Sequence, residues 1–200
     1  MEYTTVWRGS TMEDRSNDRR EMLIDAGFNL LGTAGAAGTT VTAVCRDAGL
    51  SRRYFYENFA GREELLVAVQ NRLFDDMRTI VESNPMQGDI EQQLHALFVT
   101  AAVYFEEDPR RVRIVCRESF ADHTLRENLA VAAPPFILAA AGHFAPLMID
   151  GDNPAATVSL LYGGITTLFI DWLDGRVTAT HDEVANACTQ LVLTLASPSK

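Results

Sequence analysis

Apolar residues recur every three or four positions along most of the chain, and glycine, proline or aspartate separates one such run from the next. This spacing places the apolar side chains of each run on one face of a helix. No convincing segment alternates apolar and polar residues with the period of two that a half-buried strand needs. The pattern therefore predicts an all-α protein of about nine helices.

The first predicted helix lies near the N-terminus. It opens at Asp18, because Glu21 three residues later completes a capping-box pattern. An apolar stripe follows, and three glycines within residues 32–38 then end the helix. Residues 1–16 are polar and carry no periodicity, so we predict a flexible arm there, in which Met12 is a possible native start.

Two short helices follow the first one. Thr40 is a good N-cap for the earlier of them, and Gly49 ends that helix after little more than two turns. Ser51 caps the later one, in which Phe55 and Phe59 sit four positions apart and face inward. Both helices are thus bounded by residues that favour helix ends.

These two helices form a predicted helix-turn-helix at residues 40–59. Gly49 permits the positive φ that the tight turn needs, so the second helix can lie in a major groove of DNA. Arg52 and Arg53 project from its first turn, where base edges and phosphates would lie. The alternative is that Arg52 and Arg53 merely lie on a solvent-exposed helix face. Arginines taken alone are more often found there than at DNA.

Further helices fill the rest of the chain. A long one is predicted over residues 62–83, and proline and glycine then break the chain. Pro134 and Pro135 remove amide donors and predict a kink or break in the helix that contains them. The remaining helices are predicted over residues 90–107, 109–120, 124–147, 155–174 and 181–196.

The charge of the chain is unevenly distributed. The formal net charge of −10 argues against a protein coated in nucleic acid, since binding to the phosphate backbone relies on cations. The segment 39–62 nevertheless carries more basic than acidic residues: Arg46, Arg52, Arg53 and Arg62 against Asp47 and Glu57. We therefore expect a small basic module on an acidic body.

Other function classes find little support. The three cysteines form no CxxC pair and the four histidines have no metal-ligand spacing, so we predict no metal site and no cofactor. No nucleophile, base and orienting group follow in a recognisable order, so a small helical enzyme is a weak alternative and no catalytic residue is predicted. With no signal peptide or membrane span visible, we expect a cytoplasmic protein.

The helix-turn-helix residues carry a family resemblance. The segment 40–65, TVTAVCRDAGLSRRYFYENFAGREEL, resembles the DNA-binding signature of the TetR family of transcriptional regulators. The likeness covers the AGLS turn, the aromatic FY pair and the FxGREEL passage into the fourth helix. It implies three domains: an arm at residues 1–16, a DNA-binding domain at 17–64, and a ligand-binding and dimerisation domain at 65–197.

The resemblance also implies DNA-contacting residues. Two departures from the family pattern stand out, because position 53 is often small and Glu57 replaces a frequent histidine. Near phosphates Glu57 is unfavourable unless it accepts a hydrogen bond from a cytosine amine or pairs with an arginine. The residues expected at bases or backbone, with Ser51 as the cap that positions them, are Thr40, Thr42, Ser51, Arg52, Arg53, Tyr54, Tyr56 and Arg62.

The two last predicted helices carry narrow apolar seams typical of helix bundles. The family resemblance favours a symmetric dimer through them, whereas the alternative is that both seams pack on the body of the same subunit. Two recognition helices of a homodimer would read a palindromic operator. The seam residues are Val158, Leu161, Ile165, Leu168, Trp172, Val184, Cys188, Leu191 and Leu195.

The middle helices hold enough aromatic residues to line an apolar pocket with a few polar fixing points. Filling of the core is the alternative for each single aromatic residue. The residues expected at the pocket are Phe98, Phe105, Phe120, His123, Phe136, His143, Tyr162, Thr166 and Phe169.

Together these features predict a ligand-responsive regulator of transcription. We expect a homodimeric repressor that an apolar or amphipathic small-molecule effector releases from double-stranded operator DNA. An architectural DNA-binding protein without an effector is the alternative.

Overall fold

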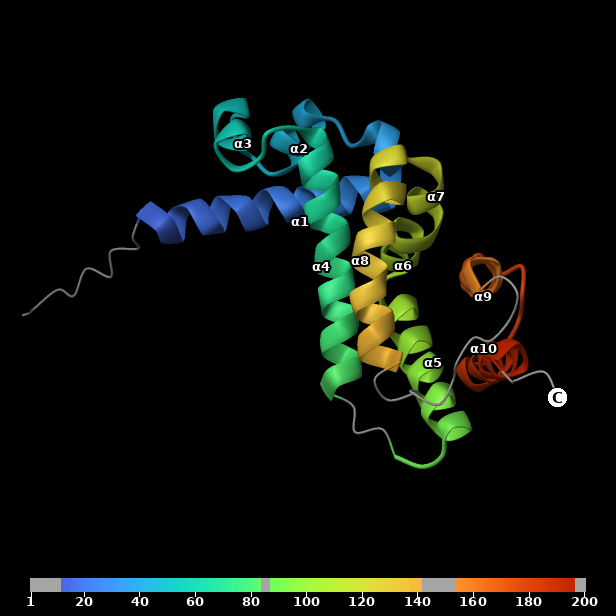
Figure 1. Ribbon diagram of the computed structural model, residues 1–200. Helices are drawn as coiled ribbons and strands as arrows, with labels where there is room; N and C mark the ends of the chain where they lie inside the picture. Colours follow the sequence, from blue (N-terminus) through green and yellow to red (C-terminus); the bar gives the residue numbers. More distant parts are fainter. Residues whose placement is uncertain (1–11, 84–86, 142–153, 197–200) are drawn as a thin grey trace, which may run out of the picture. The chain divides into compact units, whose positions relative to one another are not determined.

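The computed structural model describes residues 12–83, 87–141 and 154–196 (Figure 1). The residues in these ranges form helices and connecting turns and contain no strand, which confirms the predicted all-α class. The chain divides into an N-terminal unit, Met1–Val69, and a C-terminal unit, Gln70–Lys200. The helix α4, Arg62–Ser83, begins in the first unit and ends in the second.

The N-terminal unit consists of α1 (Met12–Gly38), α2 (Val41–Asp47), α3 (Arg52–Asn58) and the first turns of α4. Gly27 lets α1 approach α4 closely, because a Cβ atom at Gly27 would lie only 3.0 Å from Cγ2 of Val69. A compact apolar core holds these helices together. Its buried members include Leu23, Leu31, Val44, Phe55, Phe59, Leu65, Leu66 and Val69.

The start of α1 differs from the prediction. The helix begins at Met12, so Asp18 lies inside it and the capping-box interpretation was wrong. No glycine or proline interrupts the chain between Met12 and Ala26, and the helix therefore extends back through part of the expected arm. The three glycines also act differently: Gly32 is helical, Gly35 breaks the regular backbone with φ 76°, and the helix ends only at Gly38.

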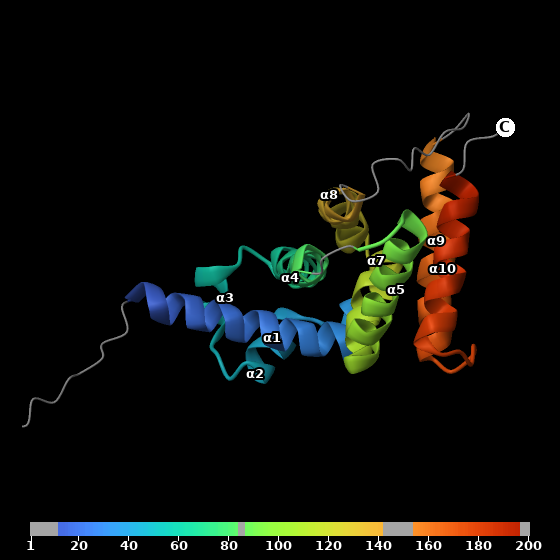
Figure 2. The ribbon, with the colours of Figure 1, turned by 90° about the horizontal axis from the view of Figure 1, so that it is seen from below.

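The C-terminal unit consists of the remainder of α4 and the following helices. In both views α9 and α10 lie side by side, and α5 packs against α10 (Figures 1 and 2). Counted with α6, η1 and α7 as one continuous run, the described residues form nine helices. The bounds in this unit are α5 (Ile90–Glu107), α6 (Pro109–Val112), η1 (Arg113–Glu118, a π-helical stretch), α7 (Ser119–Ala121), α8 (His123–Ala141), α9 (Pro154–Leu173) and α10 (His181–Ala196).

The expected break at Pro134 and Pro135 was wrong, because α8 continues through both residues to Ala141. Proline keeps a helical φ and removes one amide donor, so a helix can contain it when its other hydrogen bonds persist. The predicted stop at Asp108 and restart at Pro109 are confirmed. The Asp108 side chain caps α6 by accepting a hydrogen bond from the amide of Arg110.

A buried polar network joins α4 to α7 and α8. Gln70 is fully buried, and its Nε2 donates to the Ser119 hydroxyl at 2.7 Å and to the Leu125 carbonyl at 3.2 Å. Its Oε1 accepts a hydrogen bond from Nδ2 of Asn128, which also donates to Oδ1 of Asn71. The side chain of Gln70 thus places three of its hydrogen bonds inside the unit and cannot be replaced by an apolar residue without loss.

Three buried groups of the C-terminal unit make its stability sensitive to alkali. Burial raises the pKa of the Cys116 and Cys188 thiols from 9.0, and that of the Tyr104 hydroxyl from 10.0, to about 12. The unfolded chain releases these protons at lower pH than the folded chain does. The free energy of unfolding is therefore expected to be level with respect to these groups below pH 9 and to fall between pH 9 and 12.

Urea unfolding followed by circular dichroism at pH 8, 9, 10 and 11 measures this loss. Cys188→Ala removes one of the titrating groups and should make the decline shallower. A free energy of unfolding that stays constant up to pH 11 would contradict the expectation.

Candidate nucleic-acid interface

The ends of α2 and α3 are built as predicted. The Thr40 hydroxyl accepts from the amide of Ala43 at 3.2 Å, and the Ser51 hydroxyl accepts from the amide of Tyr54 at 3.5 Å. Gly49, in the turn between the helices, has φ 65°, the left-handed conformation that favours glycine. The helix-turn-helix geometry predicted from these residues is therefore confirmed.

We expect Ser51→Ala to destabilise α3 by about 1 kcal/mol, because the first-turn amide of Tyr54 then loses its acceptor. Ser51→Gly is the matched control and should cost only a few tenths of a kcal/mol, since glycine leaves that amide open to water. Amide hydrogen exchange along α3 measures both variants. Equal losses in the two would show that the hydroxyl does not cap the helix.

The exposed face of α3 carries the residues expected to meet DNA. Phe55 is fully buried, whereas Tyr54 is 40% and Tyr56 57% exposed. Arg52 and Arg53 are exposed beside them. Their inward and outward placement is as predicted, and the DNA contacts themselves stay a prediction.

Each arginine of α3 has a defined partner. Nη2 of Arg52 donates to the Thr42 hydroxyl at 2.9 Å and so joins α3 to α2. Nε of Arg53 donates to Oε1 of Glu57 at 2.9 Å, one turn further along α3. This hydrogen bond, and then the carboxylate charge, raise the pKa of Arg53. Of the two roles foreseen for Glu57, the structure shows the pairing with an arginine.

Two basic residues of α1 support α3 and were not singled out from the sequence. The guanidinium of Arg19 lies 4.9 Å from the ring centre of Tyr54, and that of Arg20 lies 5.0 Å from the ring centre of Phe59. Cation–π contacts of this kind fix aromatic rings. The sequence offered only their positions in a helix as a signal, and nothing in the pattern pointed to α3.

Arg62 has two backbone partners within the chain, and its expected phosphate contact stays a prediction. Its Nε donates to the Thr39 carbonyl at 3.0 Å and its Nη2 to the Ala36 carbonyl at 2.6 Å. Ala36 lies in the last turn of α1 and Thr39 follows its end, where carbonyls accept from groups outside the helix; the Ala36 carbonyl also accepts from the amide of Thr39 at 3.1 Å. In the structure Arg62 fastens the end of α1 to the start of α4.

The residues expected to line a ligand pocket are mostly elsewhere. Phe105 and Phe169 are buried, with ring centres 5.3 Å apart, and Phe98 packs on the apolar cluster around Val81 and Leu94. These three aromatic residues therefore fill the core, which was the alternative. Phe136 belongs to α8, but its side chain is not described, and His143 lies outside the described residues.

The other pocket residues divide between surface and interior. His123 has a side chain that is 83% exposed and lies 3.4 Å from Glu127, so it is not a fixing point in a cavity. Phe120 is 46% exposed, and its ring centre lies 5.6 Å from that of Tyr162. Tyr162 donates to the Val115 carbonyl at 3.3 Å, and the nearby Thr166 is buried. Both are satisfied inside the unit.

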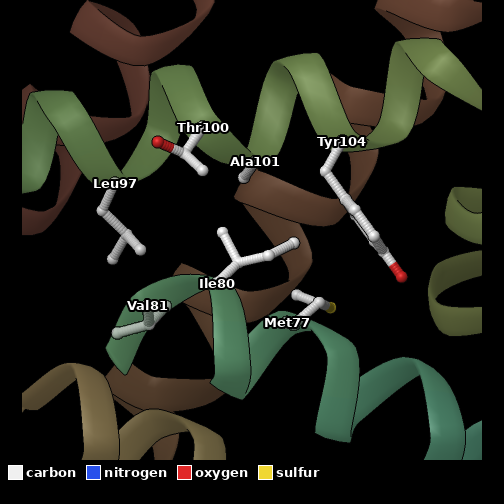
Figure 3. Close-up of a pocket in the computed structure, with 7 residues that line it drawn as sticks. All are labelled: Met77, Ile80, Val81, Leu97, Thr100, Ala101 and Tyr104. Atoms are coloured by element: carbon white, nitrogen blue, oxygen red, sulfur yellow. The ribbon is translucent and has the colours of Figure 1, made fainter. Parts of the chain in front are cut away.

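A hollow nonetheless lies between α4 and α5 (Figure 3). Its cavity volume is about 20 Å³, room for about one water molecule and far below the roughly 300 Å³ at which ligand sites begin. The Tyr104 hydroxyl is buried and has no hydrogen-bond partner within the described residues. The lining residues are Met77, Ile80, Val81, Leu97, Thr100, Ala101 and Tyr104.

The predicted dimer seams lie partly inside the chain. Val184 and Cys188 are 1% exposed and Leu161 is 9% exposed, so these three residues pack within the same chain. They follow the alternative left open by the pattern, because α10 buries one face against α5. The side chain of Val158 is not among those described. The remaining seam residues are half-buried: Ile165, Leu168, Trp172, Leu191 and Leu195.

Residues 23–69 match the family model of bacterial regulatory proteins of the tetR family. The matched segment contains α2, α3 and the turn between them. The N-terminal segment of this protein is thus that of a TetR-family regulator. The matched family comprises bacterial regulatory proteins. Within the described residues, no group of three or more histidine, cysteine or acidic side chains is placed to hold a metal.

Several solved structures share the fold of this TetR-family chain. A putative TetR-family regulator from Rhodococcus sp. is 17% identical with a TM-score of 0.69, covering 90% of this chain and all of that one. The regulator FadR from Bacillus subtilis, solved in complex with stearoyl-CoA, is 12% identical with a TM-score of 0.65, covering 87% of this chain and 97% of that one. At these identities the likeness concerns the fold alone.

A curated relative matches over part of its length. The nucleoid occlusion factor SlmA from Marinomonas sp. is 22% identical over 124 residues, which make up 60% of this chain and 61% of that protein. Among the described residues of this TetR-family chain, no helix combines the length and apolarity needed to cross a membrane.

Proposed function

We propose that this TetR-family protein is a ligand-responsive repressor that binds a palindromic operator as a homodimer. The observation that carries the DNA-binding part is α3, whose Arg52, Arg53, Tyr54 and Tyr56 are exposed on a helix with a capped start. In this proposal Thr40 and Thr42 at the start of α2 contact phosphates beside them.

The proposed effector site is the hollow between α4 and α5. Its lining is largely apolar, and the buried Tyr104 hydroxyl is a polar group without a partner among the described residues. Burial of such a group costs free energy unless a hydrogen bond compensates it. An amphipathic effector with an apolar body and a hydrogen-bonding group meets both requirements once the hollow widens to admit it and opens toward the Tyr104 hydroxyl, which points away from the other lining residues (Figure 3).

The proposed response follows from the course of α4. This helix starts directly after the helix-turn-helix with Arg62 and contributes Met77, Ile80 and Val81 to the hollow. An effector that binds better to one position of α4 than to another shifts the population toward that position. Release of the operator requires that the favoured position disfavours DNA.

A mobility-shift assay on duplex DNA from upstream of the protein's own coding region tests the proposal. We expect retardation at low salt that an effector reverses, and stearoyl-CoA is a reasonable first probe because FadR was solved with it. A protein without an effector site would bind DNA but show no thermal stabilisation with any amphipathic probe. Absence of retardation at low salt would contradict the DNA-binding part.

A further inference from the structure

Arg53 and Glu57 form an ion pair within α3, whereas Arg52 donates to the neutral Thr42 hydroxyl of α2. The two residues of the pair lie one turn apart on the exposed face, with side chains that are 85% and 41% exposed. An exposed pair of this type adds little to stability. Stability therefore does not explain why the Arg53–Glu57 pair lies on the helix that is expected to enter the major groove.

The atoms used by the hydrogen bond give that explanation. Oε1 of Glu57 accepts a hydrogen bond from Nε of Arg53 at 2.9 Å. Among the described residues, this is the side-chain hydrogen bond that the structure shows for Arg53. The terminal Nη1 and Nη2 groups of Arg53 keep their donors for a further partner. Two parallel donors on an arginine fit O6 and N7 of guanine in the major groove.

The charges point the same way. Arg53 and Glu57 together are formally neutral, so the pair offers little to the sequence-independent attraction of phosphates. A carboxylate beside Arg53 also discourages its guanidinium from resting on the backbone. The hydrogen bond of Arg52, in contrast, is made to the neutral hydroxyl of Thr42 and not to a carboxylate.

We propose that Glu57 is a positioning residue that holds Arg53 for end-on recognition of a guanine, so that the pair selects sequence without adding general affinity for DNA. This inference rests on the proposed function as an operator-binding protein. Arg52, held toward α2, contributes mainly to affinity.

Selection of binding sites from randomised duplexes tests the inference with the full chain. Wild-type protein should enrich sites with a guanine at one position of each half-site. Arg53→Ala should lower that preference by about tenfold, the size of a bidentate base contact. Glu57→Ala should lower it at least about twofold, the size of the pair, while affinity for random-sequence duplex increases.

Two further variants separate positioning from charge. Glu57→Gln keeps an oxygen that accepts from Nε, so it should retain more of the guanine preference than Glu57→Ala and still bind random duplex more tightly. Glu63→Gln removes one exposed charge from the same unit without touching Arg53, and it should leave the base preference unchanged. Amide exchange along α3 verifies that each variant is folded.

The outcomes are distinct. An unchanged base preference in Glu57→Ala or in Arg53→Ala overturns the inference, as does an equal loss in Glu57→Gln and Glu57→Ala. Failure of the wild-type protein to enrich any sequence instead contradicts the proposed function, because the selection then has no operator to report.

Discussion

Phe55→Ala is expected to destabilise the helix-turn-helix by about 3–5 kcal/mol, the usual cost of truncating a buried phenylalanine. Phe55 is fully buried in α3, with its ring centre 5.7 Å from that of Phe59. The cavity left behind would face the core that α1, α2 and α4 share. Amide exchange should show protection in α2 and α3 reduced by about a hundredfold to several thousandfold.

Tyr56→Ala is the matched control for stability. Tyr56 is the next residue on the same helix and is 57% exposed, so its truncation should change amide protection by less than about tenfold. A loss in Phe55→Ala no larger than that in Tyr56→Ala would contradict the core position assigned to Phe55.

Gln70→Leu is expected to lower the free energy of unfolding of the C-terminal unit by about 2–4 kcal/mol. Leucine has a similar size but supplies neither the donors to Ser119 and Leu125 nor the acceptor for Asn128. Each buried polar group left without its partner costs about 1–3 kcal/mol, and Asn128 recovers part of this through Asn71. Urea unfolding at neutral pH measures the change.

Gln190→Leu provides the comparison for that variant. Gln190 is exposed on α10 and donates to Glu91 at 2.9 Å, so water can replace the lost contact. Its effect should lie within about 0.5 kcal/mol. A Gln70→Leu protein as stable as the Gln190→Leu protein would show that the buried network is not a determinant of stability.

The helix-turn-helix was predictable because local chemistry decides it. Thr40 and Ser51 cap helices through their own hydroxyls, and Gly49 takes a conformation that other residues avoid. Such features depend on neighbours within a few positions of the chain. The contact between Arg53 and Glu57 is local in the same sense, one helical turn apart, and had been foreseen as one of two alternatives.

The hollow between α4 and α5 was not predictable in the same way. Aromatic residues such as Phe105 and Phe169 look alike in sequence whether they fill a core or line a cavity, and only their packing across helices distinguishes the two. The hollow is lined by residues such as Met77 and Leu97, which helical spacing marks only as apolar. Tertiary contacts between distant segments decide which apolar face meets a space and which meets another helix.

Arg62 illustrates a different limit. Its position at the start of α4 suggested a phosphate contact, but nothing in the sequence indicated that its guanidinium donates to two backbone carbonyls at the end of α1. Those carbonyls belong to Ala36 and Thr39, more than twenty positions away in the chain. A spacing pattern contains no information about which helix end will lie beside a given arginine.

The central claim, that the exposed face of α3 binds operator DNA, is tested most directly by fluorescence anisotropy on a labelled duplex from the protein's upstream region. We predict that the wild-type protein binds at low salt and that the double variant Arg52→Ala/Arg53→Ala loses at least about tenfold in affinity while its thermal midpoint is unchanged. Equal affinity of the two proteins, or no binding by the wild type at low salt, would contradict the account.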